Sequence, residues 1–182
     1  MISYKHKCIF IHVPKTGGST IEEMFRQNGM PNINSQQVHI GVVKARSLYR
    51  SEFNDYFKFS VVRNPWDRVY SVWWNFKQSG KTTQTLEDFC KHLNHRSLLI
   101  PQYTMLDIHR GVCFDYIGRF EELEKVFQFV IDKFELKIDK IPHRKKRVGK
   151  PRYTEFYTPN SIDRVANFYH ADINEWGYNY GE

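Results

Sequence analysis

The feature that most constrains this chain is the stretch of residues 8–26, where an apolar run leads into a Pro-Lys-Thr-Gly-Gly-Ser-Thr turn and then into a helical pattern. The run is short and rich in β-branched and aromatic residues, which predicts a strand buried on both faces, as in parallel sheets. The two glycines of the turn lack a Cβ, so the backbone can adopt positive φ and approach a ligand closely. Ser19 or Thr20 is expected to cap a helix that runs to about Asn28, with Gly29 as its stop.

This turn is predicted to bind an anion, because helix N-terminal amides, the ammonium of Lys15 and two hydroxyls all favour negative charge. A strand, a glycine turn and a capped helix can also be purely structural, and that alternative stays open for the turn alone. The nucleotide-triphosphate loop GxxxxGK[ST] has a different order, because Lys15 precedes the glycines. Gly80-Lys81-Thr82 has the local order of that loop, but Asn75 occupies the place of its first glycine and no apolar strand leads into it.

Composition narrows the class of protein. The chain has 182 residues, 41% hydrophobic and 16% aromatic, so we expect a single folded domain over residues 1–182. The net charge of +7 favours an anionic partner, which a nucleotide, an acidic glycan, a nucleic acid or an anionic membrane would satisfy equally.

Three widely spaced cysteines predict free thiols, and neither a disulfide framework nor a zinc site. The sequence has no secretion signal and no apolar run of about twenty residues, which predicts a soluble, cytoplasmic protein.

A second strand carries a charged residue at its end. Residues 56–63 alternate and then become apolar, which predicts a strand ending at Arg63. Pro65 suits the first turn of the helix expected over residues 66–78, whose apolar residues at spacings of three and four form a core-facing stripe. Ser71 lies eight residues beyond Arg63 and can turn toward the strand end.

Together, PKTGGST after a strand and FSVVRNPWDRVYSVWWNF at the next strand and helix resemble the phosphate motifs of sulfotransferases that use 3′-phosphoadenosine 5′-phosphosulfate (PAPS). The resemblance is strongest to the membrane-type carbohydrate sulfotransferases and their bacterial relatives. It extends from Cys8 to Tyr178, through the phrase YIGRFEELEKVF and an Asp-x-x-x-aromatic-Gly-Tyr ending. Trp73 stands where relatives often have tyrosine, which we interpret as a packing change. The implied fold is α/β with three layers, a mostly parallel sheet flanked by helices, of the nucleotide-kinase-like type.

The resemblance implies transfer of a sulfuryl group from PAPS to an acceptor hydroxyl, with release of adenosine 3′,5′-bisphosphate. Lys15 would stabilise charge on the leaving oxygen. His39 would take the acceptor proton, because relatives carry a histidine about this far before the second motif; by the residues alone, a histidine at a loop or helix start is usually a solvated side chain. The implied cofactor-binding residues are Lys15, Thr16, Gly17, Gly18, Ser19, Thr20, Arg63, Ser71, Arg147 and Lys150. No metal is expected, since the sequence offers no carboxylate cluster.

Two residues are assigned to the substrate by the same resemblance. Gln102 would lie near the acceptor. Arg119, at the end of a third strand predicted over residues 114–120, would orient cofactor or acceptor, or would instead form an ion pair with Glu121 or Glu122.

The basic run of residues 143–150 contains Arg147 and Lys150. Sulfotransferases often close such a loop over the 3′-phosphate, whereas alone it would indicate a solvated loop or a nucleic-acid contact. Further helices are expected over residues 39–49, 85–93, 121–135 and from residue 160 onward. Thr85 is expected to cap the second of them. Arg68 is expected to be an exposed helical residue.

Two other classes of function stay open. An ATP-dependent small-molecule kinase would share the sheet and the anion loop but would need Mg²⁺ ligands, which the sequence does not show. A non-enzymatic nucleic-acid-binding module would explain the charge but not the two spaced anion motifs. We expect a carbohydrate hydroxyl as the acceptor, with a lipid or a small metabolite as alternatives, and neither nucleic acid nor a membrane span as a partner.

Overall fold

The computed structural model describes residues 1–31, 38–94, 97–142 and 151–182, which form two compact units. The first, here called the sheet unit, comprises Met1–Val62 and Met105–Lys146. The second, the helical unit, comprises Arg63–Thr104 and Arg147–Glu182. The organisation of residues 1–182 as a single domain stays a prediction.

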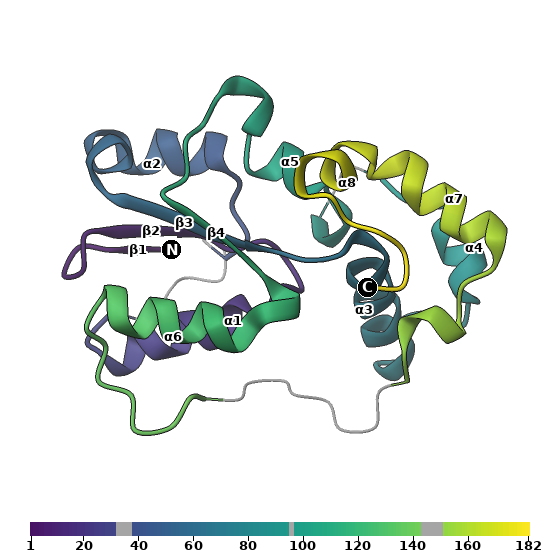
Figure 1. Ribbon diagram of the computed structural model, residues 1–182, viewed down its shortest axis with the longest axis horizontal. Helices are drawn as coiled ribbons and strands as arrows, with labels where there is room; N and C mark the ends of the chain where they lie inside the picture. The colour runs from purple at the N-terminus through teal and green to yellow at the C-terminus, as the bar shows by residue number, and fades with distance from the viewer. Residues whose placement is uncertain (32–37, 95–96, 143–150) are drawn as a thin grey trace. The chain divides into compact units, whose positions relative to one another are not determined.

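The sheet unit is built on four strands in the order β1-β2-β3-β4 (Figure 1). They are β1 (Ile2–Ser3), β2 (Cys8–Ile11), β3 (Phe57–Val62) and β4 (Tyr116–Arg119). β2, β3 and β4 are parallel, and the short β1 runs antiparallel to β2. Val62 is paired with Arg119 in register, so β3 and β4 end at the same edge of the sheet. The predicted mostly parallel sheet is confirmed, with strands slightly shorter than predicted and β1 in addition.

Helices cover both faces of this sheet (Figure 1). α1 (Gly18–Gln27) and α6 (Leu123–Lys133) lie on one face and α2 (Val42–Asp55) on the other, which confirms the three layers. Two short 3-10 helices, Ile108–Arg110 and Phe120–Glu122, complete the unit. α2 begins later than predicted and continues past Tyr49 through a break at Arg50, where φ is 37°.

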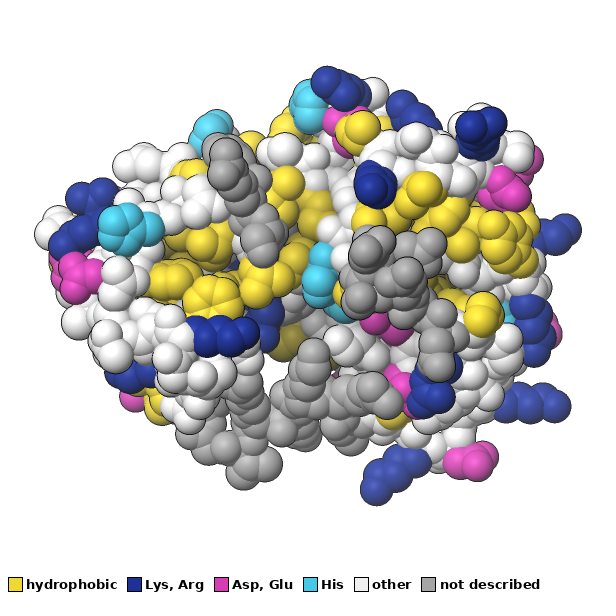
Figure 2. Space-filling view, turned by 180° about the vertical axis from the view of Figure 1, so that it is seen from behind, with side chains coloured by type: hydrophobic (Ala, Val, Ile, Leu, Met, Phe, Trp, Pro, Cys, Tyr) yellow, Lys and Arg dark blue, Asp and Glu magenta, His cyan; other side chains and the backbone are white. Residues whose placement is uncertain are grey.

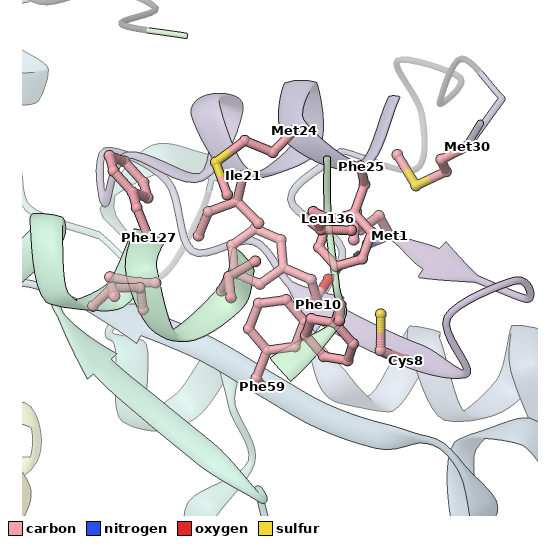
Figure 3. Close-up of a cluster of buried hydrophobic side chains, with 14 residues drawn as sticks. Met1, Cys8, Phe10, Ile21, Met24, Phe25, Met30, Phe59, Phe127 and Leu136 are labelled. Atoms are coloured by element: carbon pink, nitrogen blue, oxygen red, sulfur yellow. Dashed lines mark hydrogen bonds between the residues drawn. The ribbon is translucent and has the colours of Figure 1, made fainter. Parts of the chain in front are cut away.

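The core of the sheet unit lies between the sheet and the helices α1 and α6 (Figure 3). Strand residues alternate between faces, so Phe10 points into this core while Ile11 points to the opposite face. Phe10 stacks on Phe59 with ring centroids 4.9 Å apart. Gly118 lets α6 approach β4, because a Cβ there would come within 2.5 Å of Val126.

The helical unit contains α3 (Pro65–Gln78), α4 (Leu86–Cys90), α7 (Pro159–Phe168), α8 (His170–Trp176) and the start of α5 (Gln102–Met105). Two 3-10 helices, Ser97–Leu99 and Tyr153–Glu155, join them. Pro65 occupies the first turn of α3, as predicted, and the Asn64 side chain caps it by accepting from the Trp66 amide at 3.1 Å. Thr85 caps α4 through the Asp88 amide, also as predicted. No helix within the described ranges is long and apolar enough to cross a membrane.

Candidate active site

The loop between β2 and α1 turns at two residues with positive φ. Lys15 has φ 70° and Gly17 has φ 81°. Left-handed residues in a turn gather backbone N–H groups into a concavity that suits an anion. α1 begins at Gly18, so its N-terminal amides and its dipole favour negative charge at the same loop. For a lysine this backbone conformation costs about 1–3 kcal/mol, which the surrounding structure must offset.

The three hydroxyl side chains of the turn lie in two places, one in the loop and two in the first turn of α1. Thr16 is buried and its Oγ1 donates to the Val13 carbonyl at 2.8 Å, which braces the loop. Ser19 and Thr20 lie inside the first turn of α1, and neither caps it. The predicted cap is wrong, because the left-handed Gly17 turns the chain and becomes the N-cap itself, before Ser19 and Thr20 in the sequence. Their part in binding an anion stays a prediction.

Protein neighbours approach both glycines closely. A Cβ at Gly18 would come within 2.3 Å of the His12 ring, and a Cβ at Gly17 within 2.9 Å of Leu123, the first residue of α6. From the sequence alone, the close approach of a ligand is the reason for these glycines. The structure adds a second reason, which is the packing of a histidine ring and a leucine against the loop.

His12 is a residue of this loop that the sequence analysis did not single out. It is 4% exposed, and its Nδ1 lies 2.7 Å from Oε1 of Glu22 on α1. Burial alone would raise the pKa of Glu22, but the hydrogen bond and charge of His12, with a smaller contribution from His39, hold that pKa below its ordinary value. The signal in the sequence is a single histidine in an otherwise apolar strand run.

His39, the predicted base, lies beside His12. Its φ is 62°, its Nδ1 lies 3.0 Å from the His12 carbonyl oxygen, and the two ring centroids are 4.2 Å apart. A carbonyl oxygen can only accept, so Nδ1 carries the proton and a neutral His39 has its lone pair on Nε2. The side chain is exposed. His39 therefore has the tautomer that a general base acting through Nε2 requires.

Arg63 follows β3 directly and is held at both its side chain and its backbone. It is 6% exposed, and its Nε and Nη2 donate to Oδ2 of Asp67 at 2.8 and 2.6 Å. The carboxamide of Gln102 bonds both backbone groups of Arg63: Oε1 accepts from the amide at 2.9 Å and Nε2 donates to the carbonyl at 2.8 Å. A hollow of about 480 Å³ within the helical unit is lined by Arg63, Asp67, Pro151, Arg152, Tyr153, Thr154, Gly181 and Glu182. A guanidinium in such a hollow can bind a phosphate.

Ser71 is half-buried in the second turn of α3. Gln102 is 0% exposed and bonds Arg63 and Asp172, so the structure gives it a role inside the helical unit. Its predicted contact with the acceptor stays a prediction. Arg147 and Lys150 lie outside the described residues.

Arg119 is half-buried at the end of β4. Glu122 hydrogen-bonds to Lys125 at 2.6 Å, and this bond, with the charges of Lys125 and then Arg119, holds the pKa of Glu122 below its ordinary value. Arg119 thus lies within electrostatic range of Glu122. Both alternatives for Arg119, the ion pair and the substrate contact, remain open.

Arg68 was expected to be exposed, and this prediction is wrong. The residue is 1% exposed, its Nη1 and Nη2 donate to the carbonyls of Leu98 and Ile100, and its guanidinium lies 5.2 Å from the Tyr169 ring centroid. The reason is that other parts of the helical unit cover this side of α3. Trp73 is also buried, and its Nε1 donates to the Gln84 carbonyl at 3.0 Å.

Across the described parts of the chain, no three His, Cys, Asp or Glu side chains are grouped so that they could hold a metal ion. All three cysteines are free thiols, as predicted.

The sequence model described as "Sulfotransferase family" matches residues 1–179. Among solved structures, the crystal structure of mouse sulfotransferase SULT7A1 complexed with PAP matches with a TM-score of 0.62, covering 94% of this chain and 86% of that chain. The two sequences are 10% identical, so this likeness shows the fold alone. The comparison with curated proteins gives no match.

Proposed function

Because the chain belongs to the sulfotransferase family, we propose that it transfers a sulfuryl group from PAPS to a hydroxyl group of a carbohydrate and releases adenosine 3′,5′-bisphosphate. One observation carries the proposal: the loop between β2 and α1 brings Lys15 and a helix N-terminus together, with His39 bonded to the His12 backbone. The carbohydrate acceptor rests on the resemblance of the two phosphate motifs to carbohydrate sulfotransferases.

The residues of the loop fit the phosphosulfate end of PAPS. The amide of Thr20 already donates to the Gly17 carbonyl at 3.0 Å. We therefore assign the 5′-phosphate to the amides of Gly17, Gly18 and Ser19 and to the hydroxyls of Ser19 and Thr20. Thr16 supports this loop from beneath through its bond to Val13.

When bound, PAPS supplies an activated sulfuryl group, whose bond to the bridging oxygen breaks as the bond to the acceptor oxygen forms. Lys15 places positive charge where the bridging oxygen gains its negative charge. His39 takes the acceptor proton on Nε2, while the His12 carbonyl keeps the other proton on Nδ1. Each proton and electron pair thus has a defined destination.

The 3′-phosphate is assigned to the helical unit. Arg63 would bind it through the guanidinium oriented by Asp67. Ser71 would donate from α3, and Arg147 and Lys150 would add charge.

The proposal is tested by incubating the protein with labelled PAPS and a panel of hydroxylated carbohydrates, lipids and small metabolites, and by reading transfer as a mass shift. We expect transfer to carbohydrate.

His39→Ala should lower kcat by about 10²–10⁴, the range of a positioned base, and should leave the affinity for adenosine 3′,5′-bisphosphate unchanged. His92→Ala, which changes an exposed histidine of the helical unit, is the matched control. Wild-type turnover in His39→Ala would remove the base assignment and leave the family unchanged.

Binding experiments on the same protein distinguish a sulfotransferase from the two other classes of function, a kinase and a nucleic-acid-binding module. A kinase would be stabilised against heat by ATP with Mg²⁺ more than by adenosine 3′,5′-bisphosphate. A nucleic-acid-binding module would show steep salt-dependent binding of DNA or RNA and no response to either nucleotide. On the face shown in Figure 2, the Lys and Arg side chains of the described residues are spread among acidic and apolar ones.

A further inference from the structure

The proposed 3′-phosphate ligand, Arg63, is the first residue after β3, which ends at Val62. The Gln102 carboxamide matches its peptide groups, since Oε1 accepts from the Arg63 amide while Nε2 donates to its carbonyl. A glutamine can make this paired contact because its side chain carries a donor and an acceptor side by side. The Arg63 backbone is therefore fixed by a side chain 39 positions away.

Asp172 of α8 determines which way this carboxamide points. Its Oδ2 accepts from both the backbone amide of Gln102 at 2.9 Å and Nε2 at 3.1 Å, and its Oδ1 accepts from the Tyr103 amide at 2.9 Å. A carboxylate can only accept, so Nε2 must face Asp172 and Oε1 must face the Arg63 amide. Asp172 and Gln102 are both 0% exposed, so water does not compete for these bonds.

The side chain of Arg63 is directed separately, by the two bonds to Asp67 on the first turn of α3. Its backbone and its guanidinium are thus each held by a different partner. A shift of the Arg63 Cα would move the guanidinium away from its place even with Asp67 intact.

We propose that Gln102, oriented by Asp172, is a positioning residue for recognition of the 3′-phosphate of the donor through Arg63. This inference rests on the proposed function and adds a residue whose contact with the donor is indirect. Loss of the Gln102 carboxamide should weaken the interaction with the 3′-phosphate and leave the interaction with the rest of the nucleotide intact.

The test compares the Kd of adenosine 3′,5′-bisphosphate with that of adenosine 5′-phosphate, which lacks the 3′-phosphate, by calorimetry on the full chain. Gln102→Met keeps a side chain of similar length but cannot make the hydrogen bonds of the carboxamide. In this variant the preference for the bisphosphate should fall about tenfold or more, because a small misplacement of the Arg63 guanidinium is costly. The Kd of adenosine 5′-phosphate should stay within about twofold of wild type, because this nucleotide has no 3′-phosphate for Arg63 to bind. Gln84→Met, at an exposed glutamine of the same unit, should change neither constant.

Arg63→Ala should abolish the preference for adenosine 3′,5′-bisphosphate over adenosine 5′-phosphate. Adding Gln102→Met to it should cause no further loss, since both residues act on the one contact between Arg63 and the 3′-phosphate. If Gln102→Met does not fold, Gln102→Asn, which keeps the carboxamide on a shorter side chain, is measured in the same way. An unchanged preference in these variants, or an equal loss for both nucleotides, would overturn the inference alone. A wild-type chain without preference for the bisphosphate would overturn the 3′-phosphate assignment of the proposed function as well.

Discussion

The loop at Lys15 in the sheet unit is made from consecutive residues, 13–20, whereas the surroundings of Arg63 in the helical unit are assembled from distant ones. Arg63 is bonded by Gln102, 39 positions along the chain, and Gln102 by Asp172, 70 positions beyond that. The loop presents mainly backbone amides, and the second region depends on buried side chains. A site built from backbone groups is thus fixed by the geometry of its turn, whereas a site built from side chains requires every bond of its network.

The largest effect is expected at Lys15, the cation in the backbone-built loop. Lys15→Ala should lower kcat by roughly 10²–10³, the cost of removing one group that stabilises developing charge. Binding of adenosine 3′,5′-bisphosphate should weaken as well, because the former bridging oxygen stays on its 5′-phosphate and Lys15 is one of the proposed cofactor-binding residues. Single-turnover rates with labelled PAPS measure the effect, with Lys44→Ala at an exposed lysine of α2 as control. A rise in KM at unchanged kcat would assign Lys15 to binding alone.

The stability of the helical unit should also depend on a buried hydrogen-bond donor outside the candidate site, the guanidinium of Arg68. Arg68→Met removes the donors to Leu98 and Ile100 and should lower the free energy of unfolding by about 2–4 kcal/mol, because a buried guanidinium is lost and two partly buried carbonyls lose their partner. Urea unfolding followed by tryptophan fluorescence measures this change. Arg164→Met on the exposed side of α7 should shift stability by less than about 0.5 kcal/mol. Equal effects of the two variants would show that the hydrogen bonds donated by Arg68 do not stabilise the helical unit.

Gly18→Ala tests the loop through its packing. A Cβ within 2.3 Å of the His12 ring should cost about 1–3 kcal/mol of stability, the usual range for overpacking. His12→Ala makes room, so the double variant should be more stable than the sum of the single changes predicts. Thermal unfolding of all four proteins gives this coupling free energy. Strict additivity would show that the ring does not limit the loop.

The smallest effect concerns Glu22 and has a defined pH dependence. Its pKa in the folded chain is below the ordinary value of 4.5, so its bond to His12 stabilises the fold above that pH and this stability is lost as pH falls through the lowered pKa. Glu22→Gln should cost roughly 1 kcal/mol at neutral pH. The difference between wild type and variant should shrink in acid, as measured by melting temperature from pH 7 to about pH 3. Glu124→Gln, at an exposed glutamate of α6, should show no such trend.

What the sequence predicted well is local. The individual strands, the helix after the glycine turn and the cap of Thr85 depend on neighbours within a few residues, and each is present. The cap assigned to Ser19 or Thr20 failed because the left-handed Gly17 starts the helix earlier, and φ is not visible in residue types alone.

What the sequence did not reveal depends on long-range contacts. The pairing of His12 with Glu22 and of Gln102 with Asp172 arises only when strands and helices pack. Arg68 was misjudged for the same reason, since periodicity shows the apolar face of α3 but not that its other side is covered too. The resemblance to sulfotransferases supplied His39, which local patterns alone would have left as a solvated histidine.

The thiols have a consequence for experiments on the two units. Cys8 in the sheet unit and Cys90 in the helical unit are buried, and burial raises the pKa of each to about 12, whereas Cys113 is exposed. A thiol reagent should therefore label one cysteine rapidly in the native protein and reach the other two only through opening of their unit. The chain thus carries one built-in probe of opening in each unit. Equal labelling rates at Cys8 and Cys90 would mean that the two units open together, and unequal rates that they open separately.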